Sequence, residues 1–479
     1  MRFCRLLVAL LAGGTLATAC ADISQVPPTP GPRAIFDTTT PILPLPNDVL
    51  RGADGFLTLP LSDCSKVPAP YKTQCELTNE IEKSLNTLDG WLTGQTLEIP
   101  VDSPLDVSTL PGNVILWDIT NPAIPVVVDP STYFLFFNKG ITPATKSPYM
   151  ITLKNKSPGA MQMPADFPQG HKYFAYVRNT PAPGSPVKDK SGNALIEAPV
   201  NFFFKAKSAL YENGHSTVSV LDDADAKKLE AGRLLFAPLF AAFEAKGAFK
   251  REEIAAFSVF TIQSGPRALY NPTSVNKNLP TPCDEPGKPA NASLTSTPTV
   301  LFDMALDKTT VSATNFMLFK MNAGVATPVP INAVYTPNPV PGKPYVALTA
   351  VPTVLPLQKG TTYMVVTTNG IKSEKGTVTA SLTTFSTTRY TYPLLNETTT
   401  PVSLNSPFLD NTLDVLILLG GDPATAKQSE WDFAYGMLIQ NLQGLEVLRQ
   451  YYAPFYSAAI AQGVDRYAIT ALWTFTTTN

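Results

Sequence analysis

An internal repeat restricts the possible folds of this 479-residue chain more than any other feature of its sequence. Two stretches share identical residues at a constant offset of 216 positions. The identical pairs are Leu229 and Leu445, Glu230 and Glu446, Arg233 and Arg449, Ala237 and Ala453, Pro238 and Pro454, Ala242 and Ala458, Ala245 and Ala461, and Gly247 and Gly463. Matches that keep one order over such a stretch indicate a duplicated unit, so we expect two copies of one structure.

The repeat continues on both sides of this stretch. Downstream, Arg251, Ile254, Ala256, Phe260 and Thr261 match Arg466, Ile469, Ala471, Phe475 and Thr476 after a gap of one residue. Upstream, Tyr173, Asn179, Val187, Lys188 and Gly192 align with Tyr363, Asn369, Ile371, Lys372 and Gly376. We therefore expect both copies to contain the same elements in the same order.

Each copy is predicted to contain short strands followed by one amphipathic helix. Apolar runs predict strands at residues 114–117, 133–137 and 149–153 and at residues 299–302, 316–320 and 345–348. A strand with a glycine-bearing turn and a strand ending in phenylalanine follow in each copy. The helices are expected at about residues 223–246 and 430–462, each before a last strand that ends in Phe-Thr. Asp222 and Asp223 are candidate N-caps, and the prolines at 238 and 454 should kink or break the helices.

Composition favours a fold rich in β-structure. Charged residues make up only 15% of the chain, and its 46 prolines are about twice the usual share. Such a composition is typical of short strands joined by rigid turns. We predict a mainly β chain with inserted helices, organised as two tandem β-sandwich domains at residues 35–264 and 299–479. Each carries its amphipathic helical insertion before its last strand, and a proline-rich linker at residues 265–298 joins them.

The N-terminus has the parts of a bacterial signal peptide. Two arginines precede a short apolar run, and the small residues Ala17, Thr18 and Ala19 lead to Cys20. This arrangement resembles the lipobox of bacterial lipoproteins, in which the cysteine becomes the lipidated N-terminus. We expect residues 1–19 to be removed and Cys20 to carry the lipid. Ordinary cleavage at Ala19 with an incidental cysteine is the alternative.

The residues after the lipid site bear on localisation. Residues 20–34 are polar and proline-rich, which predicts a tether between the lipid and the fold. Ala21 follows the cysteine, and resemblance to sorted lipoproteins then implies the outer membrane, on its periplasmic or cell-surface side. No later segment approaches 18 consecutive apolar residues, so the lipid is the only membrane anchor we expect.

Three cysteines remain in the expected mature chain beyond the lipid site. Cys64 and Cys75 flank a short proline-rich loop in an oxidising compartment, and we predict a disulfide between them. Cys283 is then left unpaired. No spacing of cysteine and histidine resembles a zinc site, and the chain has only 2 histidines. We therefore predict no metal and no cofactor.

The second copy contains VLFDMALDKTTVSATNFMLFKM, LQKGTTYMVVTTNGIKSEKGT and LTTFSTT, in this order. It resembles the bacterial Ig-like domains of S-layer and other surface proteins. Those domains have an apolar strand, a strand with the pattern pL-x-x-G-T-x-Y, a glycine turn and a final F-x-T strand. The resemblance implies that both predicted sandwiches are Ig-like.

The N-terminal part contains FDTTTPILPLPNDVL, ADGFLTLPL and LNTLDGWLTGQTLEIPVDSPLD. These segments resemble the N-terminal domain of bacterial virulence-factor lipases over roughly residues 35–264. In that family this non-catalytic region precedes an α/β-hydrolase domain. The sequence departs from the family here, since it ends at Asn479 where a hydrolase domain would follow, so we expect no such domain.

Catalytic and metal-binding motifs are weak in this sequence. A nucleophile elbow needs G-x-S-x-G, and the nearest string, around Ser216, has Val218 in place of the second glycine. His215 and His171 are the only candidate bases. Asp222, Asp223 and Asp225 could suggest calcium, as could Asp48 and Asp54 with Asn47, but the aspartates at 222–225 lack the glycine and distal glutamate of a calcium loop, and helix capping explains them better.

These observations together favour a protein that is not an enzyme. The four tryptophans, with Tyr451, Tyr452 and Tyr456, could form sugar-binding platforms, but aromatic side chains at such spacings are more often core. The net charge of −2 excludes nucleic acid as the expected partner. We expect a membrane-anchored surface lipoprotein that acts as a non-catalytic binding or scaffold module for an unknown protein or glycan. The alternative is an accessory or degenerate component of a secreted lipase or esterase system.

Overall fold

The computed structural model describes residues 31–37, 42–139, 149–157, 162–179, 186–269, 290–340, 342–381 and 383–479. The predicted signal peptide, Cys20, most of the predicted tether and Cys283 lie outside the described residues. Within the described ranges, every helix falls short of the combined length and hydrophobicity that a membrane span requires.

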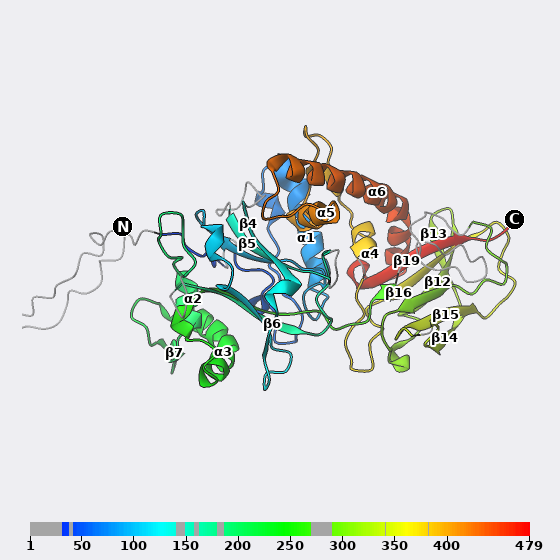
Figure 1. The fold of residues 1–479 in the computed structure, drawn as a ribbon. Helices are drawn as coiled ribbons and strands as arrows, with labels where there is room; N and C mark the ends of the chain where they lie inside the picture. Colours follow the sequence, from blue (N-terminus) through cyan, green and yellow to red (C-terminus); the bar gives the residue numbers. More distant parts are fainter. Residues whose placement is uncertain are drawn as a thin grey trace, which may run out of the picture.

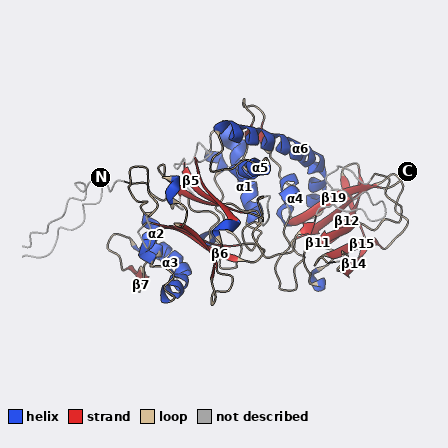
Figure 2. Cartoon of the chain, in the orientation of Figure 1, coloured by secondary structure: helices blue, strands red, loops and turns tan. Residues whose placement is uncertain are grey.

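Helices and strands contribute about equally to the described residues, so the prediction of a mainly β chain is wrong (Figure 2). The helices are α1 (Lys72–Leu85), α2 (Pro199–Phe204), α3 (Asp223–Ala245), α4 (Thr383–Thr388), α5 (Thr412–Leu418) and α6 (Gln428–Ala461). Only α3 and α6 were predicted from the sequence. In α1, a spacing of four residues between Leu77, Ile81 and Leu85 places three apolar side chains on one face, and all three are buried.

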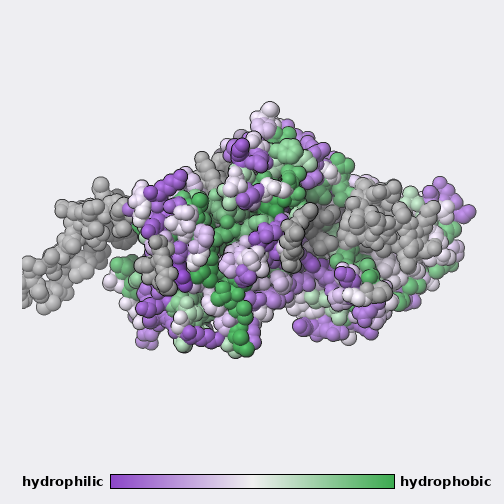
Figure 3. Space-filling view, in the orientation of Figure 1, coloured by the Kyte–Doolittle hydropathy of each residue, from purple (hydrophilic) through white to green (hydrophobic). Residues whose placement is uncertain are grey.

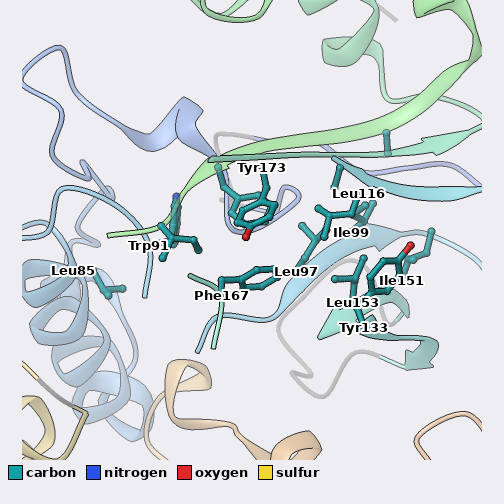
Figure 4. Close-up of a cluster of buried hydrophobic side chains, with 14 of the residues drawn as sticks. Leu85, Trp91, Leu97, Ile99, Leu116, Tyr133, Ile151, Leu153, Phe167 and Tyr173 are labelled. Atoms are coloured by element: carbon teal, nitrogen blue, oxygen red, sulfur yellow. The ribbon is translucent and has the colours of Figure 1, made fainter. Parts of the chain in front are cut away.

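The described part of the first half contains two antiparallel sheets and a short hairpin. Its strands are β1 (Leu97–Val101), β2 (Val114–Asp118), β3 (Val126–Val127), β4 (Tyr133–Lys139), β5 (Tyr149–Asn155), β6 (Lys172–Arg178), β7 (Tyr211–Glu212), β8 (His215–Ser216) and β9 (Ile254–Thr261). The sheet orders are β1-β5-β4 and β3-β2-β6-β9, and β7 pairs with β8. Side chains of both sheets meet in one apolar cluster, in which Leu97 and Ile99 of β1 join Leu116 of β2 and Tyr173 of β6 (Figure 4).

In the residues that the structure describes, the second half has the same arrangement with one more strand. Its strands are β10 (Ala268–Leu269), β11 (Thr299–Phe302), β12 (Phe316–Asn322), β13 (Val325–Val329), β14 (Ile331–Pro337), β15 (Val346–Pro352), β16 (Thr362–Thr368), β17 (Leu395–Asn396), β18 (Ser403–Leu404) and β19 (Ile469–Thr476). The sheet orders are β10-β11-β15-β14 and β13-β12-β16-β19, and β17 pairs with β18. Strand β10 lies within the predicted linker, so part of that segment belongs to a sheet.

The residues matched in the sequence repeat occupy equivalent positions in the two larger sheets. In the first, Tyr173 of β6 pairs with Phe260 of β9; in the second, Tyr363 of β16 pairs with Phe475 of β19. Each pair of strands also has one register shift, at Val177/Arg178 and at Thr367/Thr368. The shared strand order and register support the repeat.

Helices α3 and α6 cover corresponding faces of these sheets. Phe236 and Phe240 of α3 pack in one cluster with Phe174 of β6. Tyr452 and Tyr456 of α6 pack in another cluster with Met364 and Val366 of β16. Both helices begin and end close to their predicted bounds, and the side chain of Asp222 accepts the N-cap hydrogen bond of α3, as predicted.

The two prolines do not interrupt the helices, which corrects the prediction of a break. Pro238 lies inside α3, and Pro454 lies inside α6. In each helix a buried aromatic side chain precedes the proline by two residues and another follows it by two, and these side chains hold both parts of the helix on the sheet. The missing proline N–H removes one hydrogen bond, a cost that the packing offsets.

The predicted phenylalanine-ended strands are also wrong. The segment LTTFSTT contains α4, and the matching segment of the first half contains α2. The reason lies in the sheet, because β16 is already paired on both sides, with β12 and with β19. A strand after the glycine turn therefore has no free edge beside β16, and the chain forms a helix that packs on α6 instead.

The two halves share apolar packing through the N-terminal part of α6. Figure 1 shows α6 running from above the first half to the second half, with α1 and α5 nearby. Leu438 and Leu442 of α6 belong to the same buried cluster as Leu77 and Ile81 of α1. Lys154 of β5, itself buried, donates to Asp414 of α5 at 3.1 Å. The largest apolar cluster thus includes residues of both predicted domains.

Candidate functional site

Helix α1 is fixed to its own half of the chain by a disulfide. Cys64 and Cys75 are bonded, with their Cα atoms 5.7 Å apart, and they are the two cysteines that the sequence analysis paired. The Asn79 side chain accepts from the Ser62 N–H and donates to its carbonyl oxygen, at 2.8 and 2.9 Å. Both contacts hold the preceding loop against the helix and leave another side of α1 free to contact the second half.

That side of α1 binds the segment between α4 and β17. The Glu80 carboxylate accepts from the Thr391 N–H at 2.7 Å and from the Thr391 hydroxyl, and Tyr467 donates to it at 3.4 Å. Ser84 accepts a hydrogen bond from the Arg389 guanidinium. The helix thus places one carboxylate and one hydroxyl against backbone and side-chain donors of the second half. We call this surface of the second half the covered face, and it comprises α4, β17 and the residues between them, 389–394.

A buried ion pair of α6 is hydrogen-bonded to the backbone of the covered face. Glu446 and Arg449 of α6 lie 2.6 Å apart, and the Glu446 carboxylate accepts from the Leu394 N–H at 3.0 Å. Burial alone would raise the pKa of Glu446, but hydrogen bonds from Arg449 and Leu394 outweigh it and hold the pKa below its ordinary value. In the first half, Glu230 and Arg233 of α3 also lie 2.6 Å apart. The repeat pairs therefore reach inward.

The first half contains an equivalent surface, which we call the open face: α2, β7, β8 and the residues between them. Three internal bonds are repeated at matching positions. The Leu210 N–H donates to Glu230 as that of Leu394 does to Glu446. The Lys205 Nζ donates to the Ile254 carbonyl at 2.6 Å, and Arg389 Nη1 donates to the Ile469 carbonyl at 2.8 Å. The backbone carbonyl oxygen of each of these two residues also accepts a hydrogen bond from an arginine. Arg251 donates to the Lys205 carbonyl, and Arg466 donates to the Arg389 carbonyl.

The open face has a mostly apolar pocket of about 340 Å³. Its lining consists of Phe202, Phe203, Ala206, Ser208, Ala209, Leu210, Glu212, Thr217 and Val218. Phe202 is 61% exposed, and Val220, two residues after the lining residue Val218, is 75% exposed. Exposed aromatic and aliphatic side chains around a pocket are typical of binding surfaces.

A second apolar surface lies on the hairpin of β2 and β3. Ile124, Val126 and Val127 are all exposed, and β3 forms the edge of its sheet. Figure 3 shows this hairpin as the apolar projection at the lower middle of the molecule. None of these three side chains is charged.

The weak catalytic candidates do not form a catalytic arrangement. The Ser216 hydroxyl donates to the Val218 carbonyl at 2.9 Å, and His215 contacts Asp223 at 3.3 Å. His171 lies 2.7 Å from Asp118 at one end of the β6 strand. The two histidines thus pair with different aspartates, and the Ser216 hydroxyl is bonded to the backbone of Val218.

The aspartates considered for calcium have structural roles. Asp222 caps α3, and Asp223 accepts from the Ser216 N–H at 2.7 Å. Asp48 is buried and accepts from both the N–H and the hydroxyl of Thr261, and Asp54 accepts from the Phe56 N–H. Among the residues that the structure describes, no cluster of three or more histidine, cysteine or acidic side chains could hold a metal ion.

The lipase-like motifs also carry structural contacts. In the LDG element, Asp89 accepts from the Ser264 N–H at 3.0 Å. Gly90 lies so close to the end of β9 that a Cβ atom would be 2.7 Å from the Thr261 carbonyl oxygen. Both residues therefore tie the N-terminal segment to the end of the sheet. Of the aromatic side chains considered for sugar binding, Trp91, Trp473, Tyr452 and Tyr456 are buried.

One acidic side chain of α1 lacks the partners that Glu80 has. Glu82 is 7% exposed, and its Oε2 atom is buried without a hydrogen-bond partner. Burial raises the pKa of Glu82 from 4.5 to about 7. A carboxyl group in this setting favours the neutral form in the folded chain.

Replacing Glu82 with glutamine should therefore stabilise the chain at about pH 8 by about 1–3 kcal/mol. Between pH 4.5 and 7 the unfolded chain ionises this group first, so its contribution to stability falls as the pH rises. Near pH 4 the variant and the parent should be equally stable. Denaturant titrations at the two pH values measure this.

The matched control is Glu80→Gln, two residues earlier on the same helix. It removes a carboxylate that accepts charge-assisted hydrogen bonds, so it should destabilise the chain at pH 8 by about 1.5–3 kcal/mol. A Glu82→Gln variant that is less stable than the parent at pH 8 would contradict the pKa shift.

Sequence reasoning missed the open and covered faces, although a signal existed. Residues 199–212 and 383–396 keep one offset of 184, the same offset as the Val187 and Ile371 match. Few identities mark this stretch, and it was predicted as a phenylalanine-ended strand in each copy rather than as a surface. No family model matches this chain, and a search of curated proteins found no match either.

Proposed function

We propose that the protein is an outer-membrane lipoprotein that acts as a non-catalytic binding module. The open face carries this proposal, because it combines a pocket with an exposed aromatic side chain. The absence of an elbow glycine at Val218 favours binding over ester hydrolysis.

We further propose that each half is an Ig-like sandwich. Two antiparallel sheets with inward-facing apolar side chains support this in both halves. The helix on the outer face of one sheet, and the insertion that precedes the last strand, would then be additions to that core. A sandwich provides a rigid scaffold on which inserted elements present a binding surface.

The membrane anchor is tested at Cys20. Cys20→Ser should move the protein from the membrane fraction to the soluble periplasmic fraction, and mass spectrometry of the native protein should find an acylated N-terminus. A single myristoyl-like chain binds membranes only marginally, whereas several acyl chains on one cysteine anchor a protein stably. We therefore expect nearly all of the parent protein in the membrane fraction and nearly all of the Cys20→Ser protein in the soluble fraction. A Cys20→Ser protein that stays membrane-bound would refute the lipid anchor.

The binding role is tested by purification from detergent-solubilised membranes. A partner that co-purifies with the parent and is lost from a Phe202→Ser variant would support binding through the open face. Phe433→Ser, which changes an equally exposed phenylalanine on α6, serves as the control. A co-purifying hydrolase would favour the accessory role in a lipase or esterase system, and ester hydrolysis by the purified chain that depends on Ser216 would refute a non-catalytic role.

A further inference from the structure

We infer that the open face binds an amphipathic helix of a partner polypeptide, in the way that the covered face binds α1. This partner class presupposes the binding function proposed above. The two faces are equivalent by position, since three hydrogen bonds beneath them are repeated. One of them is occupied by a helix, and the other is exposed.

The covered face shows what such a helix contributes. Helix α1 places Leu77 and Ile81 in the apolar cluster that also contains Tyr390 and Leu394 of the covered face. Its Glu80 carboxylate accepts from the Thr391 N–H. An apolar stripe with one carboxylate beside it is the pattern of helix-in-groove recognition.

The donors that bind Glu80 have counterparts on the open face. At the offset of 184, Lys207 and Ser208 correspond to Thr391 and Tyr392. Within the described residues, the backbone N–H groups of Lys207 and Ser208 have no hydrogen-bond acceptor, and both residues are exposed. Two free N–H groups in succession offer a carboxylate the two backbone bonds that Glu80 makes, with the Thr391 N–H at 2.7 Å and the Tyr392 N–H at 3.5 Å, but not the bond from the Thr391 hydroxyl.

Charge at the open face favours a carboxylate at this point. The Lys207 side chain is 66% exposed, and its Nζ atom lies 3.8 Å from both Glu244 and Glu252, too far for a strong hydrogen bond to either. It can therefore turn toward an acidic side chain of a bound helix. Glu212 also lines the pocket and disfavours a uniformly acidic partner, so we expect a helix with one carboxylate rather than many.

The pocket itself follows from a difference between the two halves. Ala206 stands where the covered face has Tyr390, whose ring is buried beneath α1. The smaller side chain leaves space that a larger apolar side chain of the partner can fill. Phe202 stands where the covered face has Ser386, and it adds apolar area at the rim.

The test uses α1 itself as the probe. A fluorescent peptide with the sequence of residues 72–87, with serine in place of Cys75, is titrated into the purified chain. The covered face is already occupied, so we expect saturable binding at one site below about 1 mM. A peptide with Glu80→Gln should bind about tenfold more weakly, because it loses charge-assisted bonds.

Variants of the chain locate the site. Phe202→Ser, which introduces the residue of the covered face, should weaken binding about tenfold, whereas Phe433→Ser should leave it unchanged. Hydrogen exchange should slow at residues 202–218 when the peptide is bound. Exchange that slows at residues 389–396 and accelerates at residues 72–85 would mean displacement of α1, and this would overturn the inference.

The inference would also be overturned if the peptide showed no saturable binding at 1 mM. It would be overturned as well if neither Phe202→Ser in the chain nor Glu80→Gln in the peptide changed the affinity. A failure of the peptide to bind would not refute the binding function proposed above. Membrane attachment through Cys20 and loss of a co-purified partner in Phe202→Ser are measured without the peptide, so a partner that is not a helix would leave them intact.

Discussion

Replacing Arg449 with alanine should lower the free energy of unfolding by about 3–5 kcal/mol. Arg449 and Glu446 are 7% and 6% exposed, and their closest atoms lie 2.6 Å apart. Arg449 Nη1 also donates to the carbonyl oxygens of Tyr390 and Thr391, both at 3.1 Å. The substitution would leave a buried carboxylate without its counter-charge and two carbonyls without their donor, and uncompensated buried charge is strongly destabilising. Denaturant unfolding of the purified chain measures the loss.

The repeat supplies the matched control for this variant. Arg233→Ala removes the equivalent arginine of α3, which bonds to Glu230 and reaches no backbone carbonyl in the described first half. We expect a smaller loss of about 1.5–3 kcal/mol. If Arg233→Ala cost as much as Arg449→Ala, the additional bonds to the covered face would contribute nothing.

The repeat explains how much of the fold could be predicted from the sequence. Strand and helix positions around residues 114–117, 299–302 and 223–246 were close to the observed elements, because apolar periodicity marks them clearly. Helices α2 and α4 were mistaken for strands because each has only six residues, too few to show a helical period. Their state is decided by the occupied edges of β6 in the first half and β16 in the second, a property of the whole sheet that local sequence does not contain.

The start of each copy was missed for a different reason. The string Gly-Pro-Arg-Ala occurs at residues 31–34 and again at 265–268. In the structure the backbone N–H of Arg33 donates to Asp102, and that of Arg267 donates to Asp303, both at 2.7 Å. We infer that the copies begin at these strings, which the sequence analysis placed in the tether and the linker because proline and glycine usually indicate loops.

The candidate site was least predictable, because its main feature is a difference between two copies. The disulfide followed from the spacing of two cysteines in one loop, and the inward-reaching ion pairs followed from their recurrence in both helices. By contrast, the open face differs from the covered face because α1 does not pack on it. That property depends on where α1 packs, and α1 contacts residues more than 300 positions away in the sequence.

Removing the disulfide with Cys64→Ser and Cys75→Ser together should lower the free energy of unfolding by about 2–3 kcal/mol. The bond closes a loop between residues 11 positions apart and fixes it to α1. Since α1 also carries Glu80 and Ser84, loosening its attachment should weaken its contact with the covered face. Hydrogen exchange should then accelerate at residues 389–392 as well as in α1.

Cys283→Ser is the control for this pair, because Cys283 is predicted to be unpaired. It should change neither stability nor exchange. Acceleration confined to the loop around residues 64–71 would mean that α1 remains docked without the disulfide, and the contacts of Glu80 and Ser84 would then be sufficient to hold it. Acceleration at residues 389–392 would instead show that the disulfide, a bond within the first half, stabilises the contact between the halves.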